Sequence, residues 1–201
     1  MSATRVPPVV IAILLLLIVA SAASAGTGRI PISSVDDAAS PTANRIDAVT
    51  QIVEATNDRL GRVASAFPPN PCASITEPTA FCDAAIGAFF AYSALGQTVA
   101  DACAGVPLDG PGDAVITDAD TFAADMSPTG AANQLASITI VLGNADDRLG
   151  GIQIPTPGPP DAPVATALNA LSVAIIDGGT AAGGLTGGAF EFPPNPCAVD
   201  G

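Results

Sequence analysis

The chain has 201 residues and a formal net charge of −13, with nineteen Asp and Glu residues against six Arg and no Lys, His or Trp. So negative a charge excludes nucleic acid and anionic membrane surfaces as partners. Without histidine and lysine the chain lacks the commonest general base and the side chain needed for Schiff-base chemistry, so we expect no enzyme. An acidic, lysine-free composition is typical of halophilic proteins, although a biased genome composition would produce the same pattern.

Residues 1–25 have the features of a secretory signal peptide. Arg5 supplies the positive charge, residues 9–20 form an unbroken apolar run, and Ala23 and Ala25 are small residues of the kind that a signal peptidase recognises. We therefore expect cleavage after Ala25 and a secreted or cell-surface protein. The alternative is an uncleaved membrane anchor, because the apolar stretch reaches roughly the 20 residues that a helical span needs.

The rest of the chain predicts one all-α domain, at 41–201, behind a flexible linker at 26–40 that shows no apolar periodicity. Apolar residues at helical spacing and local start signals predict four helices, at about 41–60, 79–104, 128–149 and 161–177. Gly61 and the pair Gly178-Gly179 are expected to end the first and the last helix, and the Gly- and Ala-rich stretch 180–188 is expected to be irregular. The β-branched run 138–141 leaves a strand as a minor alternative there.

A repeated four-residue word indicates an internal duplication. Asp58-Arg59-Leu60-Gly61 matches Asp147-Arg148-Leu149-Gly150, and the apolar residues before the two copies align. The chain therefore predicts a four-helix bundle built from two helix–loop–helix repeats, at about 41–105 and 128–180, with a C-terminal strap at 181–201. Each arginine is expected to cap its helix and to pair with a nearby Asp, in preference to a catalytic Asp–Arg pair.

A second repeated word, Phe-Pro-Pro-Asn-Pro-Cys, occurs at 67–72 and again at 192–197. Prolines fix φ and cannot donate to a hydrogen-bond ladder, so each copy predicts a stiff, non-helical strap. We expect the aromatic ring of each strap to enter an apolar groove and its cysteine to form a disulfide. Two unrelated proline loops are the alternative. The residues of this structural motif are Phe67, Asn70 and Cys72, with Phe192, Asn195 and Cys197.

Four cysteines behind a secretory signal predict two disulfides. Cys82 and Cys103 stand at the two ends of one predicted helix, roughly 31 Å apart, so they cannot pair. The favoured pairing is Cys72–Cys82 with Cys103–Cys197, and the crossed pairing of Cys72 with Cys103 and Cys82 with Cys197 stays open. A zinc site is a weaker hypothesis because no histidine is present.

Other candidate sites have little support. The acidic stretch that begins at Asp118 lacks the glycine and the closing glutamate of an EF-hand. Glu54 is the glutamate nearest an apolar stripe, but a two-carboxylate glycosidase would need sugar-stacking aromatics that are scarce here. Tyr92 and Met126 are the only possible haem ligands, and a core tyrosine is the better interpretation. We expect neither a cofactor nor a metal.

These observations favour a secreted or cell-surface structural or interaction protein, non-catalytic, that associates with itself or with components of the cell envelope. The alternative is an extracellular binding module that carries a small apolar ligand between its helices. Apolar residues left exposed on the bundle would favour assembly, whereas a closed interior pocket of several hundred cubic ångströms would favour the carrier.

Overall fold

The computed structural model describes residues 42–73, 79–106, 108, 126–152, 160–192 and 196–197. They form four long helices and one short 3-10 helix, namely α2 (Thr42–Ala66), η1 (Pro71–Ala73), α3 (Thr79–Cys103), α4 (Pro128–Gly150) and α5 (Ala162–Thr186). The described residues contain no strand, so the predicted all-α class is confirmed for them, and 138–141 belong to α4. The predicted signal peptide, the linker and the acidic stretch at Asp118 lie outside the described ranges.

Local capping residues set the start of α4 and of α5, as their sequences predict. The side chain of Ser127 accepts a hydrogen bond of 3.2 Å from the backbone N–H of Gly130, and Pro128 follows it as the first residue of α4. Asp161 accepts a bond of 3.0 Å from the N–H of Val164. Both bonds satisfy backbone donors that have no partner within the helix.

Two helices continue past the glycines at which the sequence predicts their ends. α2 runs through Gly61 to Ala66, and α5 runs through Gly178 and Gly179. A glycine within a helix costs about 1 kcal/mol relative to alanine, but it does not force the helix to stop. The predicted ends are therefore wrong, and so is the predicted irregular segment at 180–188, most of which is helical.

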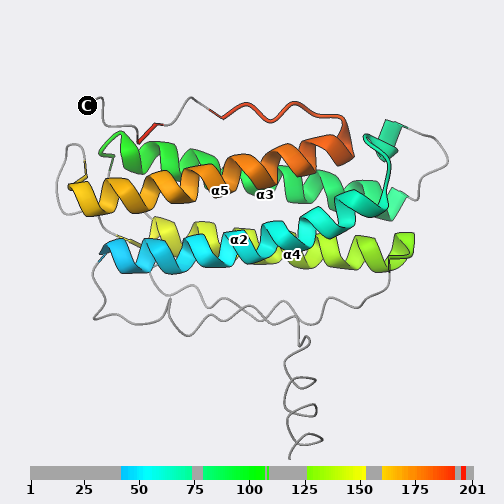
Figure 1. Ribbon diagram of the computed structural model, residues 1–201, viewed down its shortest axis with the longest axis horizontal. Helices are drawn as coiled ribbons and strands as arrows, with labels where there is room; N and C mark the ends of the chain where they lie inside the picture. Colours follow the sequence, from blue (N-terminus) through cyan, green and yellow to red (C-terminus); the bar gives the residue numbers. More distant parts are fainter. Residues whose placement is uncertain are drawn as a thin grey trace, which may run out of the picture.

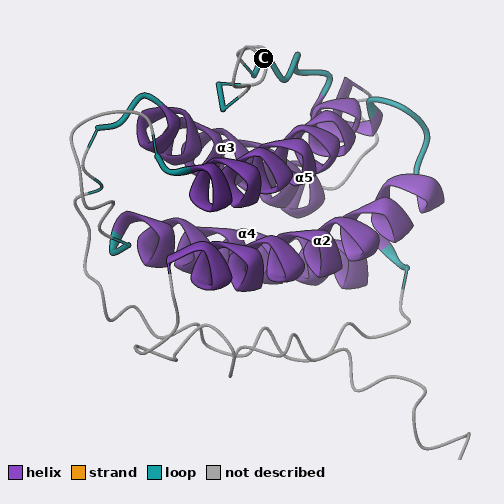
Figure 2. Cartoon of the chain, turned by 60° about the vertical axis from the view of Figure 1, so that its left-hand side comes forward, coloured by secondary structure: helices purple, strands orange, loops and turns teal. Residues whose placement is uncertain are grey.

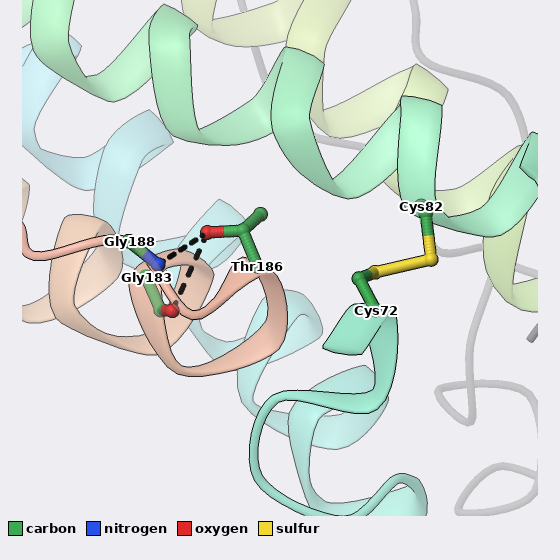
Figure 3. Close-up of a disulfide and its surroundings, with 5 residues drawn as sticks. All are labelled: Cys72, Cys82, Gly183, Thr186 and Gly188. Carbon is green, nitrogen blue, oxygen red and sulfur yellow. Dashed lines mark hydrogen bonds between the residues drawn. A yellow bond between two sulfur atoms is a disulfide. The ribbon is translucent and has the colours of Figure 1, made fainter. Parts of the chain in front are cut away.

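The end of α5 shows the local signal that does stop a helix. Gly187 has a left-handed φ of 75°, and its N–H donates to the carbonyl of Gly183. The hydroxyl of Thr186 donates to the same carbonyl (3.4 Å) and accepts from the N–H of Gly188 (3.1 Å), as Figure 3 shows. A glycine in this conformation is a common helix end because it carries no Cβ.

The four long helices stack in two layers, with α2 and α4 in one layer and α3 and α5 in the other (Figure 2). Across the layers α5 packs mainly on α2, and α3 packs mainly on α4. The two helices of each such pair run in the same direction (Figure 1). Because α3 and α4 are parallel neighbours, the end of α3 and the start of α4 lie at opposite ends of the bundle, and residues 104–127 join them.

The core lies between the two layers and draws side chains from all four helices. Alanines and glycines on α3 and α5 let the helices approach closely. The largest fully buried side chains are Tyr92, Phe81, Ile46, Ile52, Leu60, Leu95, Leu135, Ile138, Leu142, Leu149 and Ile152.

By length and composition alone, α3 and α5 could each cross a membrane. The core helices of water-soluble bundles meet the same criterion, and here 33% of the apolar stretch of α3 and 56% of that of α5 are buried inside the bundle. The criterion therefore gives only weak evidence for a membrane span.

Candidate functional site

The four cysteines lie in two pairs at disulfide distance. The Cα atoms are 5.5 Å apart in Cys72–Cys82 and 5.0 Å apart in Cys103–Cys197, which is the favoured pairing and not the crossed one. The first disulfide ties η1 to the first turn of α3 (Figure 3), and the second ties the C-terminal segment to the last residue of α3. Among the described residues no group of three or more Cys, Asp or Glu side chains could hold a metal ion.

The first strap bridges the end of α2 and the end of α5. The ring of Phe67 packs on that of Phe81 in α3, with centroids 4.4 Å apart. Asn70 has a left-handed φ of 55°, a conformation that Asn adopts more readily than most residues. Its N–H donates to the carbonyl of Gly184 (2.5 Å), and its side chain fills the space beside Gly187. This geometry explains why asparagine stands in the strap.

Residues 187–192, which lead from α5 into the second strap, turn back along the outside of the α3–α5 layer (Figure 1). The ring of Phe192 occupies the space that a Cβ on Gly96 of α3 would need, with a ring carbon 2.5 Å from that position. Phe190 fills the corresponding space at Gly179 of α5, and the two rings are stacked with centroids 6.3 Å apart. The glycines thus form notches that receive the strap. Asn195 lies outside the described residues.

The two copies of Asp-Arg-Leu-Gly stand at different places in their helices. Asp147 and Arg148 belong to the last turn of α4, where Arg148 is only 4% exposed. Asp58 and Arg59 lie inside α2, more than a turn before its end, so the prediction that Arg59 caps its helix is wrong. Burial, and then the charge of Arg62, lower the pKa of Arg59.

The half-buried side chain of Asn57 joins three helices. The hydroxyl of Tyr92 in α3 donates a hydrogen bond to the Oδ1 of Asn57 in α2. The Nδ2 of Asn57 donates to the backbone carbonyl of Ala174 in α5, at 2.5 Å. A Cβ at Gly178 would collide with both side chains, so this glycine makes room for the pair. Tyr92 is fully buried, and this burial raises its pKa above its ordinary value.

Asn57 does not stand out in the sequence, although a signal was present. It follows Val53 by four residues and precedes Leu60 by three, so it belongs to the buried stripe of α2. A polar residue in such a stripe needs hydrogen-bond partners, and the single tyrosine of the chain is the natural candidate.

An open groove of about 590 Å³ runs between α2 and α5 beside Asn57. Small residues form much of its lining, and the exposed carboxylates of Glu54, Asp58 and Asp177 stand along it. None of its lining residues is basic. They are Glu54, Asn57, Asp58, Gly61, Ala170, Val173, Ala174, Asp177, Gly178 and Ala181.

Several large apolar side chains are exposed on the outside of the bundle. Ile86 and Phe90 of α3 are 42% and 64% exposed, and Ile140 of α4 is 55% exposed. Gly87 of α3 lies against Thr139 of α4, so Ile86 and Ile140 stand at the same level of the bundle. Where exposed apolar side chains gather in a patch, they mark interaction sites in soluble proteins.

A scan against protein-family models, a search of curated proteins and a search of solved structures each return no match, so the function of the chain has to be inferred from its own residues.

Proposed function

We propose that the chain is a non-catalytic structural or interaction protein of the cell surface or the extracellular space, and that it assembles with itself. The observation that carries this proposal is the exposed apolar surface of α3 and α4. Ile86 and Phe90 are four residues apart and therefore share one face of α3. Ile140 stands at the same level on the neighbouring helix. Burial of these side chains against a second copy would remove apolar surface from water.

An oxidising location is part of the proposal. Both disulfide pairs close within the chain, and bonds of this kind persist outside the cytosol. Together with the signal-like residues 1–25, they support secretion. The alternative location is the membrane, with the N-terminal apolar segment uncleaved as an anchor. Components of the cell envelope are alternative partners to a second copy.

We also infer an origin by duplication, with halves at about 41–105 and 128–180. If α4 is matched with α2, and α5 with α3, the pair α2–α5 corresponds to the pair α4–α3. The two helices pack on each other in both pairs, and both pairs are parallel (Figure 1). The repeated words at 58–61 and 147–150 occupy the first helix of each half, whereas the straps differ in place, since 67–72 lies inside the first half and 192–197 follows the second. These relations support an approximate twofold symmetry.

Ligand carriage is the second candidate, and the groove between α2 and α5 is the observation that favours it. Its volume of about 590 Å³ falls within the range of small-molecule sites. The groove is open to solvent and carries three carboxylates, whereas an apolar ligand needs an enclosed apolar cavity. A discrete non-covalent adduct in native mass spectrometry would support this function over assembly.

The assembly proposal is tested by sedimentation velocity over a range of protein concentrations. We expect wild-type oligomers that are lost in Ile86→Ser and Phe90→Ser. Val173→Ser is the matched control, because Val173 is also exposed but lies on α5 beside the groove. A wild-type protein that stays monomeric at high concentration would contradict assembly through this surface.

A further inference from the structure

We propose that residues 26–34 dock in the groove between α2 and α5 of their own chain, with the guanidinium of Arg29 among the carboxylates of Glu54, Asp58 and Asp177. The docking does not depend on assembly, because it involves neither Ile86 nor Phe90. Three properties of the segment support this docking: the charge of Arg29, the apolar residues beside it and the length of chain that joins it to α2.

The groove carries negative charge. Its lining includes three carboxylates and no basic residue, so it favours a cation. The chain contains only six basic residues, all of them arginine. Arg29 is the one that belongs neither to the predicted signal peptide nor to a described helix. The other five are Arg5 in the predicted signal peptide, Arg45, Arg59 and Arg62 on α2, and Arg148 on α4.

The residues beside Arg29 match the apolar part of the groove. Ile30 and Ile32 flank Pro31. Proline and the residue before it favour extended backbone, which is the shape that an elongated groove accepts. Alanines and Val173 line the groove and offer apolar contacts to the two isoleucines.

Asn57 adds a fixed hydrogen-bonding group to the same surface. Its Oδ1 accepts from Tyr92 and its Nδ2 donates to Ala174, so the orientation of the amide is set from within the core. A carboxamide carries two N–H groups, and the second one can donate to a backbone carbonyl of the docked segment.

The tether is long enough for docking within one molecule. Twelve residues lie between Arg29 and Thr42, the first residue of α2, and the thirteen steps from one to the other can span up to about 43 Å. The groove residues Glu54 and Gly61 lie about 18 and about 29 Å along the helix axis from Thr42. A short tether holds its end at an effective concentration in the millimolar range, so the weak attraction of exposed ion pairs is sufficient.

Limited trypsin digestion tests the proposal, because Arg29-Ile30 is a tryptic site. Docking protects this bond. We expect the triple variant Glu54→Gln, Asp58→Asn, Asp177→Asn to be cut there roughly tenfold faster than the wild type, since cleavage follows the population of the undocked segment. The matched control is Asp47→Asn, Asp83→Asn, Asp101→Asn, which removes the same charge away from the groove and should leave the rate unchanged.

Two further measurements keep the test decisive if the triple variant is perturbed. Salt at about 1 M should speed cleavage of the wild type at Arg29, because it screens exposed charges. A synthetic peptide of residues 26–34 gives the rate of the free segment, and an equal rate in the wild-type protein would overturn the proposal. Protection that grows with protein concentration would overturn docking within one chain in favour of a second copy.

Discussion

The hydroxyl of Tyr92 donates a hydrogen bond to the side-chain carbonyl of Asn57, and this contact joins α3 to α2 through the middle of the bundle. The Nδ2 of Asn57 donates a second hydrogen bond to the backbone carbonyl of Ala174, so the same side chain also contacts α5. Because Tyr92 is fully buried, its hydroxyl has no access to water and depends on Asn57 for a partner.

Removal of either partner should destabilise the fold, but by different amounts. Tyr92→Phe should lower the free energy of unfolding by about 1 kcal/mol, because the half-buried Asn57 can still bind water. Asn57→Ala should cost about 1–3 kcal/mol, because it leaves the buried hydroxyl of Tyr92 unsatisfied. Urea unfolding measures both, and the exposed Asn133→Ala serves as control. A larger loss for Tyr92→Phe than for Asn57→Ala would contradict this account of the contact.

Tyr92 should also make the fold sensitive to alkali. Burial raises its pKa in the folded state, whereas an unfolded tyrosine ionises at its ordinary pKa, near pH 10. Below that pH the hydroxyl of Tyr92 is protonated in both the folded and the unfolded chain. Above it the unfolded chain has lost a proton that the folded chain keeps, so stability falls by up to about 1.4 kcal/mol per pH unit.

The chain suits this measurement because it has one tyrosine and no lysine, and its cysteines are paired. The free energy of unfolding is followed from about pH 8 to about pH 11, where tyrosine changes charge. Tyr92→Phe should show a flatter profile than the wild type. Identical alkaline slopes for the two proteins would show that Tyr92 does not titrate on unfolding.

Glycine-to-alanine substitutions should have opposite signs at different helical positions. Gly96→Ala places a Cβ against the ring of Phe192, so we expect a loss of about 1–3 kcal/mol. Gly143→Ala in α4 meets nothing within 4 Å and should gain about 0.5–1 kcal/mol from helix propensity. Thermal unfolding compares them. If the strap is the cause, Phe192→Ala should abolish the penalty of Gly96→Ala in the double variant.

The two disulfides should contribute unequally to stability. Cys103–Cys197 closes a sequence separation of 94 residues, and Cys72–Cys82 closes one of 10. On the chain-entropy account their removal costs about 5 and about 3 kcal/mol, respectively. Denaturant unfolding of the paired serine variants, Cys103→Ser with Cys197→Ser and Cys72→Ser with Cys82→Ser, provides the comparison. The reverse order would indicate that the strap contacts, and not loop closure, dominate.

Local signals located much of this fold. Ser127 before Pro128, and Asp161 before α5, mark helix starts because an N-cap acts on the next three residues alone. Helix length excluded Cys82–Cys103 and left two pairings, of which the structure has the favoured one. Such features depend on residues near one another in the chain, so one sequence is enough to identify them.

The features that the sequence could not show depend on tertiary packing. Gly178 and Gly179 resemble a helix end until Tyr92 and Phe190 are seen to occupy the space beside them. The groove likewise exists only because α5 packs beside α2. Asp177 joins the acidic residues of α2 only because α5, and not α3, packs along that helix. No local pattern encodes that choice.

Native mass spectrometry of the protein recovered from its own culture medium, without reducing agent, tests the central proposal most directly. We expect a ladder of oligomers whose subunit has lost residues 1–25 and is lighter by four further hydrogens, two for each disulfide. A bare monomer at every concentration would contradict assembly, and a full-length mass confined to the membrane fraction would contradict secretion.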